Sequence, residues 1–234
     1  MIFSGDWHGK FEAVKAIINK MDLYDDDIIQ VGDFGVGFNF NDLEILAILN
    51  VFLVERKLHV YAFRGNHDDK RYFLGKYFNW FSNLHLVPDY TVLELQGHKI
   101  LCIGGALSID RLRMKREMAK EEAAGSLPIY FESEKFNLDV KKLEEIRDID
   151  ILATHTAPSY CLPFDKGLTD PLDITLPKEL IVERQQLDTV MDILLQNNSN
   201  LTKHFYGHFH HNYLTEDRDV VHCCLGINEF KEVR

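Results

Sequence analysis

Three short apolar runs early in the chain each end in a cluster of polar residues, and this repeat constrains the fold more than any other feature. The runs cover residues 1–4, 27–31 and 58–63. Between them, apolar residues recur at helical spacing over residues 11–21 and 43–55. Strands and helices that alternate in this way predict a mainly parallel sheet in an α/β protein. The polar residues after the strands are then expected to gather at one edge of the sheet, where such folds bind ligands.

The rest of the chain predicts further strands, one long helix and one weakly patterned segment. Strands are expected over residues 91–95, 99–103, 149–153, 203–206 and 220–223, with another near Tyr213. A helix is expected over residues 178–196. Residues 108–136 are charged and weakly patterned, and we interpret them as an insertion or lid. Since no repeat or linker divides the chain, we expect a single domain over residues 1–234.

The charge balance narrows the classes of partner. The chain has 37 acidic and 26 basic residues, which gives a formal net charge of -11 at pH 7. Such an excess argues against a protein held on DNA or RNA by bulk electrostatics, and therefore against a nuclease. It does not exclude a phosphorylated substrate, because bound metal ions reverse the sign of the charge at a site.

Hydropathy and cysteine usage predict a cytoplasmic protein without a membrane partner. The apolar stretches are too short to cross a bilayer, and no basic segment followed by an apolar run indicates a secretory signal. The four cysteines are Cys102, Cys161, Cys223 and Cys224, and no pair has CxxC spacing. We therefore expect ordinary buried or half-buried thiols and no thiolate metal site.

Five short polar motifs follow the predicted strands and carry the chemistry. They are Asp6-Trp7-His8, Gly32-Asp33, Gly65-Asn66-His67-Asp68, Thr154-His155 and Gly207-His208-Phe209-His210. Each motif alone is weak, since an Asp-x-His is often a turn and a lone histidine is often a core residue. Together they place oxygen and imidazole donors at five strand ends in one chain. This donor set suits Mn, Fe, Zn, Ni or Mg, so the motifs predict a metal site.

In their order and composition, the five motifs resemble those of the calcineurin-like metallophosphoesterase superfamily. The resemblance extends from Asp6 to His210. It implies a four-layer αββα sandwich of two mixed β-sheets, forming one metallophosphoesterase domain. It also implies two divalent metal ions, with Mn²⁺ as the first expectation and Fe, Zn, Ni or Mg as alternatives. A hydroxide that bridges the ions would attack a phosphate ester.

The resemblance also assigns ligands to the two ions. It implies Asp6, His8 and His210 on the first ion, Asn66, His155 and His208 on the second, and Asp33 as the bridge. His67 resembles the non-ligand histidine of the family, which implies that it stabilises phosphoryl oxygens or protonates the leaving alkoxide. The alternative is that His67 only orients a ligand. For Asp68, both a helix N-cap and a supporting contact behind the ligands fit.

The segment Arg64-Gly65-Asn66-His67 also resembles a motif of the phosphoprotein phosphatase branch. On that basis Arg64 is predicted to clamp a phosphate through a bidentate contact. The branch continues its Gly-Asp motif with a second Asp and an Arg, whereas Phe34-Gly35 follows Asp33 in this chain. The departure leaves open both the acid partner of His67 and the assignment to protein phosphatases.

Residues 104–111 resemble a segment of small bacterial and phage members of the superfamily. Arg111 and Arg113 are therefore candidates for substrate contact, with a solvated charged helix as the alternative. Residues 108–136 are the expected specificity element, because loops on a rigid scaffold usually determine substrate choice. Trp7 lies between two proposed ligands, and we expect it to pack beneath the site.

The predicted function is hydrolysis of a phosphate ester on a small molecule or a phosphoprotein. Phosphodiesterase and dinucleoside polyphosphate hydrolase activities remain alternatives to monoesterase activity. A non-catalytic metal-dependent scaffold ranks lower, because such a protein would be expected to lose ligands or His67, and this chain retains them all. The sequence leaves the oligomeric state open.

Overall fold

The strands of the protein form two sheets that face each other. The computed structural model describes residues 1–121, 130–163 and 171–233. The first sheet contains β1 (Ile2–Ser4), β2 (Asp27–Gln30), β3 (His59–Phe63), β4 (Leu84–Val87) and β11 (Phe230–Glu232), in the order β11-β1-β2-β3-β4. The second contains β5 (Thr91–Leu95), β6 (His98–Ile103), β7 (Ile151–Thr154), β8 (Lys203–Tyr206), β9 (Tyr213–Asp217) and β10 (Val220–Cys224), in the order β5-β6-β7-β8-β10-β9.

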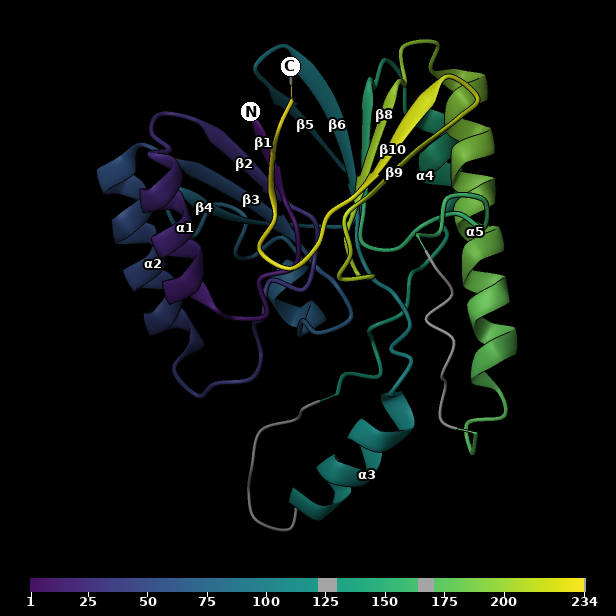
Figure 1. The fold of residues 1–234 in the computed structure, drawn as a ribbon, viewed down its shortest axis with the longest axis horizontal. Coiled ribbons are helices and arrows are strands. Elements are labelled where there is room, and N and C mark those ends of the chain that lie inside the picture. The colour runs from purple at the N-terminus through teal and green to yellow at the C-terminus, as the bar shows by residue number, and fades with distance from the viewer. Residues whose placement is uncertain (122–129, 164–170, 234) are drawn as a thin grey trace.

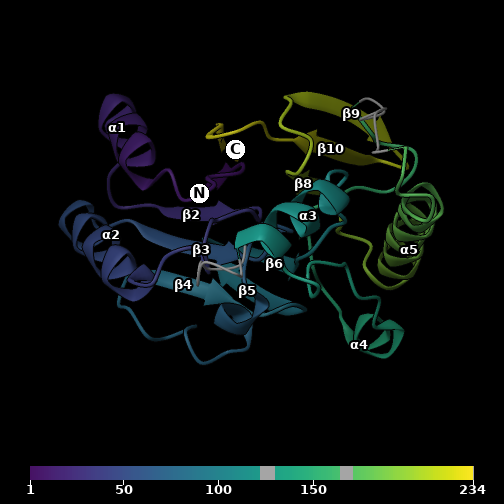
Figure 2. The same ribbon diagram turned by 90° about the horizontal axis from the view of Figure 1, so that it is seen from below.

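Helices cover the outer face of each sheet. Helices α1 (Phe11–Met21) and α2 (Asp42–Arg56) lie outside the first sheet, and α4 (Val140–Glu145) and α5 (Leu176–Asn197) lie outside the second (Figure 1). Figure 2 shows the same layers from below, with α1 and α2 on one side and α5 on the other. The architecture is the four-layer αββα sandwich of mixed sheets that the resemblance implied. None of the helices within the described ranges combines the length and apolar character that a membrane span requires.

The strands are mostly parallel, as the alternation of strands and helices predicts. In the first sheet, β1, β2, β3 and β4 run parallel, and β11 pairs antiparallel with β1. In the second, β6, β7, β8 and β10 run parallel, while β5 and β9 are antiparallel edges. The carboxyl ends of the parallel strands within a sheet therefore point the same way, and the loops after them lie at one edge.

Alternating side chains of the central strands enter different cores. Ile2 and Ile28 pack toward α1 and α2, whereas their neighbours Phe3 and Ile29 pack between the sheets. This burial on both faces explains the continuous apolar runs of the parallel strands. Phe3 is fully buried, and its ring stacks on that of Phe205 with the ring centroids 3.9 Å apart. The contact joins the central strands of the two sheets.

The predicted elements agree with the structure to within a few residues, and four further elements were not predicted. Strand β8 has the predicted bounds, and the hairpin of β5 and β6 is present. The elements missed are β4, β11, α4 and the short 3-10 helix η1 (Lys70–Phe73). Each is six residues or shorter. Periodicity over so few residues does not distinguish a strand from a turn.

The segment predicted as an insertion or lid, residues 108–136, divides into two parts with different surroundings. Helix α3 (Arg111–Glu121) projects beyond one end of the sandwich, beside the loop that leaves β6 (Figure 1). Residues 130–136 return to the sandwich, where Phe136 is buried in the core beneath α5. Residues 122–129 lie outside the described residues. The end of the segment is therefore part of the packed fold.

Replacing Phe3 with alanine tests the contact between the sheets. Phe3→Ala should lower the free energy of unfolding by about 3–5 kcal/mol, because it removes a buried ring and leaves a cavity. Phe40→Ala is the control, since the Phe40 side chain is 85% exposed and should cost less than about 0.5 kcal/mol. Urea unfolding measures both values. A cost below about 1 kcal/mol for Phe3→Ala would show that the sheets do not depend on this contact.

Candidate metal centre

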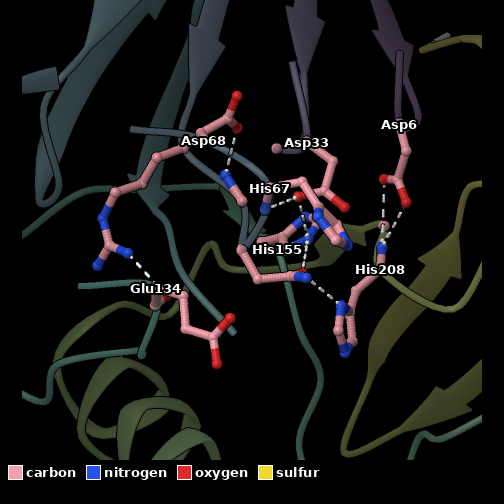
Figure 3. Close-up of polar contacts among 12 residues, drawn as sticks. Asp6, Asp33, His67, Asp68, Glu134, His155 and His208 are labelled. Atoms are coloured by element: carbon pink, nitrogen blue, oxygen red, sulfur yellow. Dashed lines mark hydrogen bonds and ion pairs between the residues drawn. The ribbon is translucent and has the colours of Figure 1, made fainter. Parts of the chain in front are cut away.

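The five motifs lie on loops that follow strands of both sheets. Asp6, Asp33 and Asn66 follow β1, β2 and β3 of the first sheet. His155 directly follows β7, and His208 and His210 follow β8, so these residues come from the second sheet. Figure 3 shows the side chains of Asp6, Asp33, His155 and His208 gathered where the two sets of loops meet. The structure thus brings the seven predicted ligands together from distant parts of the chain.

One half of the cluster contains the ligands predicted for the first ion. Asp6, His8, Asp33 and His210 each offer a donor atom, and these atoms lie within 4.8 Å of one another. His210 Nε2 is 3.0 Å from His8 Nε2 and 3.2 Å from an oxygen of Asp6. Asp6 is fully buried, and both its carboxylate oxygens accept the backbone N–H of His208. The group has the size of a coordination shell for one cation.

The other half of the cluster contains the ligands predicted for the second ion. His155 Nε2 is 2.9 Å from Asn66 Oδ1 and 3.2 Å from Asp33 Oδ1. His208 Nδ1 is 2.8 Å from the same Asn66 oxygen. His155 Nδ1 lies 2.8 Å from the Val31 carbonyl, to which it can only donate. This contact fixes the ring so that Nε2 faces the centre of the cluster.

Asp33 lies between the two halves of the cluster, and hydrogen bonds satisfy only one of its two carboxylate oxygens within the described residues. The residue is almost completely buried, and within the described residues its Oδ2 atom has no hydrogen-bond partner. A buried carboxylate oxygen in this state costs free energy unless a cation or donor compensates it. The donor types and this unpartnered oxygen fit the pair of divalent ions that the motifs predict.

The electrostatics at the cluster favour positive charge. Burial alone would raise the pKa of Asp33, but the surrounding His155, His67 and His8 hold it well below its usual range. Burial would likewise lower the pKa of His155, yet the Asp33 carboxylate outweighs burial and raises it to about 9. Asp33 therefore remains an anion at neutral pH, and its surroundings stabilise a cation.

The backbone at the cluster is strained in the way that functional sites often are. His8, Asp33, His208 and His210 have φ angles of 49°, 54°, 66° and 55°. The left-handed region costs a residue other than glycine about 1–3 kcal/mol, and it persists where the surrounding structure imposes it. Four of the seven predicted ligands adopt it here, which indicates that the loops are shaped to aim these side chains.

Two motif glycines leave room for the ligands. A Cβ atom on Gly65 would lie 2.1 Å from Asp33 Oδ1, and one on Gly207 would lie 2.2 Å from Asp6 Oδ1. Real Cβ atoms do not approach other atoms this closely. Glycine at these positions therefore lets each loop backbone pass directly against a carboxylate.

Asp68 ties two loops together and caps no helix. Its carboxylate accepts the backbone N–H groups of Phe34, Gly35 and Val36 after β2, and of Gly65 after β3. Burial, followed by the charge of Asp33, raises the pKa of Asp68 to about 7. The capping role belongs to its neighbour Asp69, which accepts the N–H of Arg71 at η1. Of the two roles considered, the supporting contact is the one formed.

Ser108 and Glu134 orient Asn66, and the motif search missed both. The Asn66 amide nitrogen donates to Ser108 Oγ at 2.9 Å, and Ser108 Oγ donates to Glu134 Oε2 at 2.6 Å. Because Ser108 holds the amide nitrogen of Asn66, the amide oxygen of Asn66 faces His155 and His208. Glu134 lies within the weakly patterned segment 108–136, so no local signal distinguished it. Burial raises the pKa of Glu134 to about 7.

Arg64 does not face the cluster, and its predicted role as a phosphate clamp is wrong. Its side chain is buried, and its guanidinium donates to Asp89 and to the backbone carbonyls of residues 133, 134 and 135. These internal acceptors engage Nε, Nη1 and Nη2, so no fork remains for a phosphate. Arg64 instead fastens the end of segment 108–136 against the loop that carries Asn66.

Arg111 and Arg113 are also engaged in internal ion pairs. Arg111 is buried and pairs with Asp173 and Glu179, which links the start of α3 to the start of α5. Arg113 is exposed and pairs with Asp110, three residues before it, and with Glu117, four residues after it. Of the two interpretations, the charged helix describes Arg113, whereas Arg111 has a structural role. The buried guanidinium of Arg111 is therefore not free for substrate contact, whereas for Arg113 that contact stays a prediction.

His67 and Trp7 both lie beside the ligands, in different surroundings. The His67 backbone N–H donates to Asp33 Oδ1 at 2.8 Å, and its half-buried ring lies 5.5 Å from the ring of His8. No carboxylate in the described part of the chain forms a hydrogen bond to the His67 ring. Trp7 is fully buried, and its indole N–H donates to Ser4. Trp7 packs beneath the site, as predicted.

Removing the serine behind Asn66 should weaken metal binding. Ser108→Ala frees the Asn66 amide to rotate, so we expect a loss of about 10–100-fold in Mn²⁺ affinity. Titration calorimetry with Mn²⁺ measures the change. Ser82→Ala is the matched control, since Ser82 is exposed and contacts Asn50 far from the cluster. Equal Mn²⁺ affinities of Ser108→Ala and the wild type would show that Asn66 is held without this contact.

Comparison with solved structures gives matches of low identity, and the sequence matches none of the curated proteins. An archaeal phosphodiesterase is 14% identical over 97% of this chain and 84% of its own, with a TM-score of 0.40. The phosphopantetheinyl hydrolase from Mycobacterium tuberculosis is 14% identical over 96% and 89%, with a TM-score of 0.44. The anchor protein of the inner membrane complex of Plasmodium is 16% identical over 97% and 71%, with a TM-score of 0.49. Similarities at this level do not establish a shared activity.

Comparison with protein families gives a match that covers most of the chain. Residues 1–212 match the Metallophos family of calcineurin-like phosphoesterases. The matched range includes every residue of the five motifs. The chain therefore belongs to the calcineurin-like phosphoesterase family and is a metal-binding phosphoester hydrolase.

Proposed function

We propose that the protein hydrolyses phosphate esters with two divalent metal ions held at the cluster around Asp33. Asp6, His8 and His210 would hold one ion, Asn66, His155 and His208 the other, and Asp33 both. One observation carries the proposal: the two oxygens of the buried Asp33 carboxylate face different ligand sets. Oδ1 is 3.2 Å from His155 Nε2, while the unpartnered Oδ2 is 3.9 Å from His8 Nε2.

The ligand charges support a site that attracts phosphate. Two divalent ions held by these residues would supply Lewis-acid activation of water and would neutralise charge on the phosphoryl group. Only Asp6 and Asp33 are anionic among the seven ligands, because the histidines and Asn66 coordinate as neutral groups. The occupied site would therefore keep a net positive charge within a chain whose net charge is -11. The donor set contains no thiolate, and we propose Mn²⁺ as the first ion to test.

His67 is the proposed proton donor to the leaving group. Its backbone is fixed by the bond to Asp33, and its half-buried ring lies at the edge of the cluster beside His8. A ring in that position can reach a group bound to the ions without being one of their ligands. In the protonated form it would deliver a proton to the departing alkoxide, and it would stabilise charge on the phosphoryl oxygens.

The internal contacts of Arg64 favour phosphodiesters as the second candidate substrate class. A terminal phosphate dianion is usually held by an arginine fork. Arg64 and Arg111 are buried and engaged by internal partners, so neither of them supplies that fork. Without that fork, the second negative charge of a monoester would strengthen its binding less, relative to a singly charged diester.

We therefore expect kcat/KM for an aryl diester in Mn²⁺ to equal or exceed that for the matching monoester. A strong preference for the monoester would contradict this expectation.

Replacing His67 tests the acid role through the leaving group. His67→Ala should lower kcat by about 10²–10⁴-fold for an alkyl phosphate ester, whose leaving group needs a proton. The loss should be smaller for a nitrophenyl ester, whose leaving group is stable as an anion. Steady-state kinetics with Mn²⁺ measure both, and calorimetry confirms that the Mn²⁺ stoichiometry is unchanged.

The outcomes separate the roles of His67. Equal losses for the two esters would indicate stabilisation of the phosphoryl oxygens, and no loss for either would remove His67 from the reaction. His98→Ala is the control, since His98 is the first residue of β6 and its ring contacts Asp150, which is not one of the proposed ligands. If the wild type hydrolyses neither ester with any of the five metals, the chain would be a metal-dependent binding protein.

A further inference from the structure

A second cluster of metal-binding side chains lies on the outer face of the second sheet. Strands β8 and β10 are parallel neighbours, and His204 stands opposite His222 in their register. The alternate residues Phe205 and Cys223 enter the core between the sheets, so the two histidines face the other way. Cys161, on the loop after β7, covers them from outside. None of these three residues belongs to the motifs around Asp33.

The three side chains have the spacing and burial of a metal site. Cys161, His204 and His222 are fully buried, and one donor atom from each lies within 4.8 Å of the others. His204 Nδ1 and His222 Nδ1 are 3.0 Å apart. Tyr206, two residues along β8, donates its hydroxyl to the Cys161 carbonyl and so fixes the backbone of the loop over the cluster.

Neighbouring hydrogen bonds determine which nitrogen of His204 is free. Thr154 Oγ1 donates to the Thr156 carbonyl at 2.6 Å, and a hydroxyl has only one proton to donate. At 2.7 Å from His204 Nε2, Thr154 Oγ1 must therefore accept a proton from that nitrogen. His204 consequently directs the lone pair of Nδ1 toward His222.

A neutral His222 carries one proton on its two ring nitrogens, and neither position of that proton gives both nitrogens a favourable contact. With its proton on Nδ1, it bonds to His204 but leaves Nε2 as a buried lone pair, and within the described residues Nε2 has no hydrogen-bond partner. With its proton on Nε2, two nitrogen lone pairs meet at 3.0 Å, which is repulsive unless a cation binds both. A cation bound to both Nδ1 atoms would replace that repulsion with coordination, and each ring would then carry its proton on Nε2.

The charge states also suit a cation. Burial holds the pKa of His204 well below its usual range and lowers the pKa of His222 to about 4. Both rings are therefore neutral near pH 7, which is the state in which imidazole binds metals. Burial raises the pKa of the Cys161 thiol, so the thiol is protonated until a metal binds.

We propose that Cys161, His204 and His222 bind a zinc-type divalent ion, separate from the ions proposed at Asp33. A thiolate with two imidazoles is a donor set that Zn²⁺ prefers, and these residues would supply three of its ligands. On binding, the Cys161 S–H bond breaks, its proton passes to solvent, and the sulfur forms a bond to the metal. The step involves no oxidation or reduction.

The ion would fix the spacing between the two ligand loops of the second sheet. Cys161 lies on the loop that begins with His155, and β8, which carries His204, leads to His208. A shared ion would fasten the first loop to β8 and β10. Two surface contacts already hold that loop, since Ser159 bonds to Asp188 of α5 and Tyr160 bonds to Arg218. The proposed role is structural, and it does not depend on the proposed reaction.

Cobalt absorption spectroscopy of the metal-depleted whole chain tests the proposal. The ligands around Asp33 include no sulfur, so a thiolate-to-cobalt charge-transfer band reports only the proposed site. Titration with Co²⁺ should give that band in the wild type, together with the intense visible bands of a tetrahedral ion. Cys161→Ala and His222→Gln should lose the band and one equivalent of bound Co²⁺. Cys223→Ala is the matched control, because it removes a buried thiol from the opposite face of β10.

Zinc X-ray absorption of the wild type gives a second measurement that requires no variant to fold. Sulfur in the zinc coordination shell of the fully loaded wild type would support the site. A wild type that binds Co²⁺ and Zn²⁺ with only nitrogen and oxygen ligands would overturn it, as would a charge-transfer band that survives in Cys161→Ala. Ester hydrolysis is assayed separately with Mn²⁺, so failure of the proposed reaction and failure of this site remain distinguishable.

Discussion

Asp33 makes the contacts on which the geometry of the candidate metal centre depends. Its backbone carbonyl accepts the N–H groups of Trp7 and His8, and its Oδ1 accepts the N–H of His67. One residue therefore holds the loops after β1 and β3 to the loop after β2. Its Oδ2 remains buried without a hydrogen bond among the described residues. The fold thus concentrates negative charge where the ligands from both sheets converge, and a cation relieves that cost.

A buried polar network behind the ligands supports this arrangement. Asp68 ties the backbone after Asp33 to that before Asn66, and Glu134 holds Asn66 through Ser108. Burial raises the pKa values of both Asp68 and Glu134 to about 7, against the lowering effect of the hydrogen bonds that each accepts. Two buried carboxyl groups outside the predicted ligand set therefore orient the ligands.

The second sheet contributes to the protein in two ways. The loops at the ends of β7 and β8 carry His155, His208 and His210, while the outer faces of β8 and β10 carry His204 and His222. Thr154, the residue before His155, bonds to His204 and so connects the two regions. Packing on this face and ligand geometry at the strand ends are therefore linked through a single short loop.

The sequence by itself determined the alternating strands and helices and the donor residues of the candidate metal centre. Both depend on local information, namely apolar periodicity and the residues that directly follow each strand. Tertiary structure decided the rest. Arg64 follows β3 as predicted, yet the buried carbonyls of residues 133–135 and Asp89 take its guanidinium. Ser108 reaches Asn66, and Cys161 meets His204 and His222, only because distant segments fold against one another. Motif spacing shows which side chains can bind a metal, whereas burial and long-range contacts determine the partners that each side chain finds.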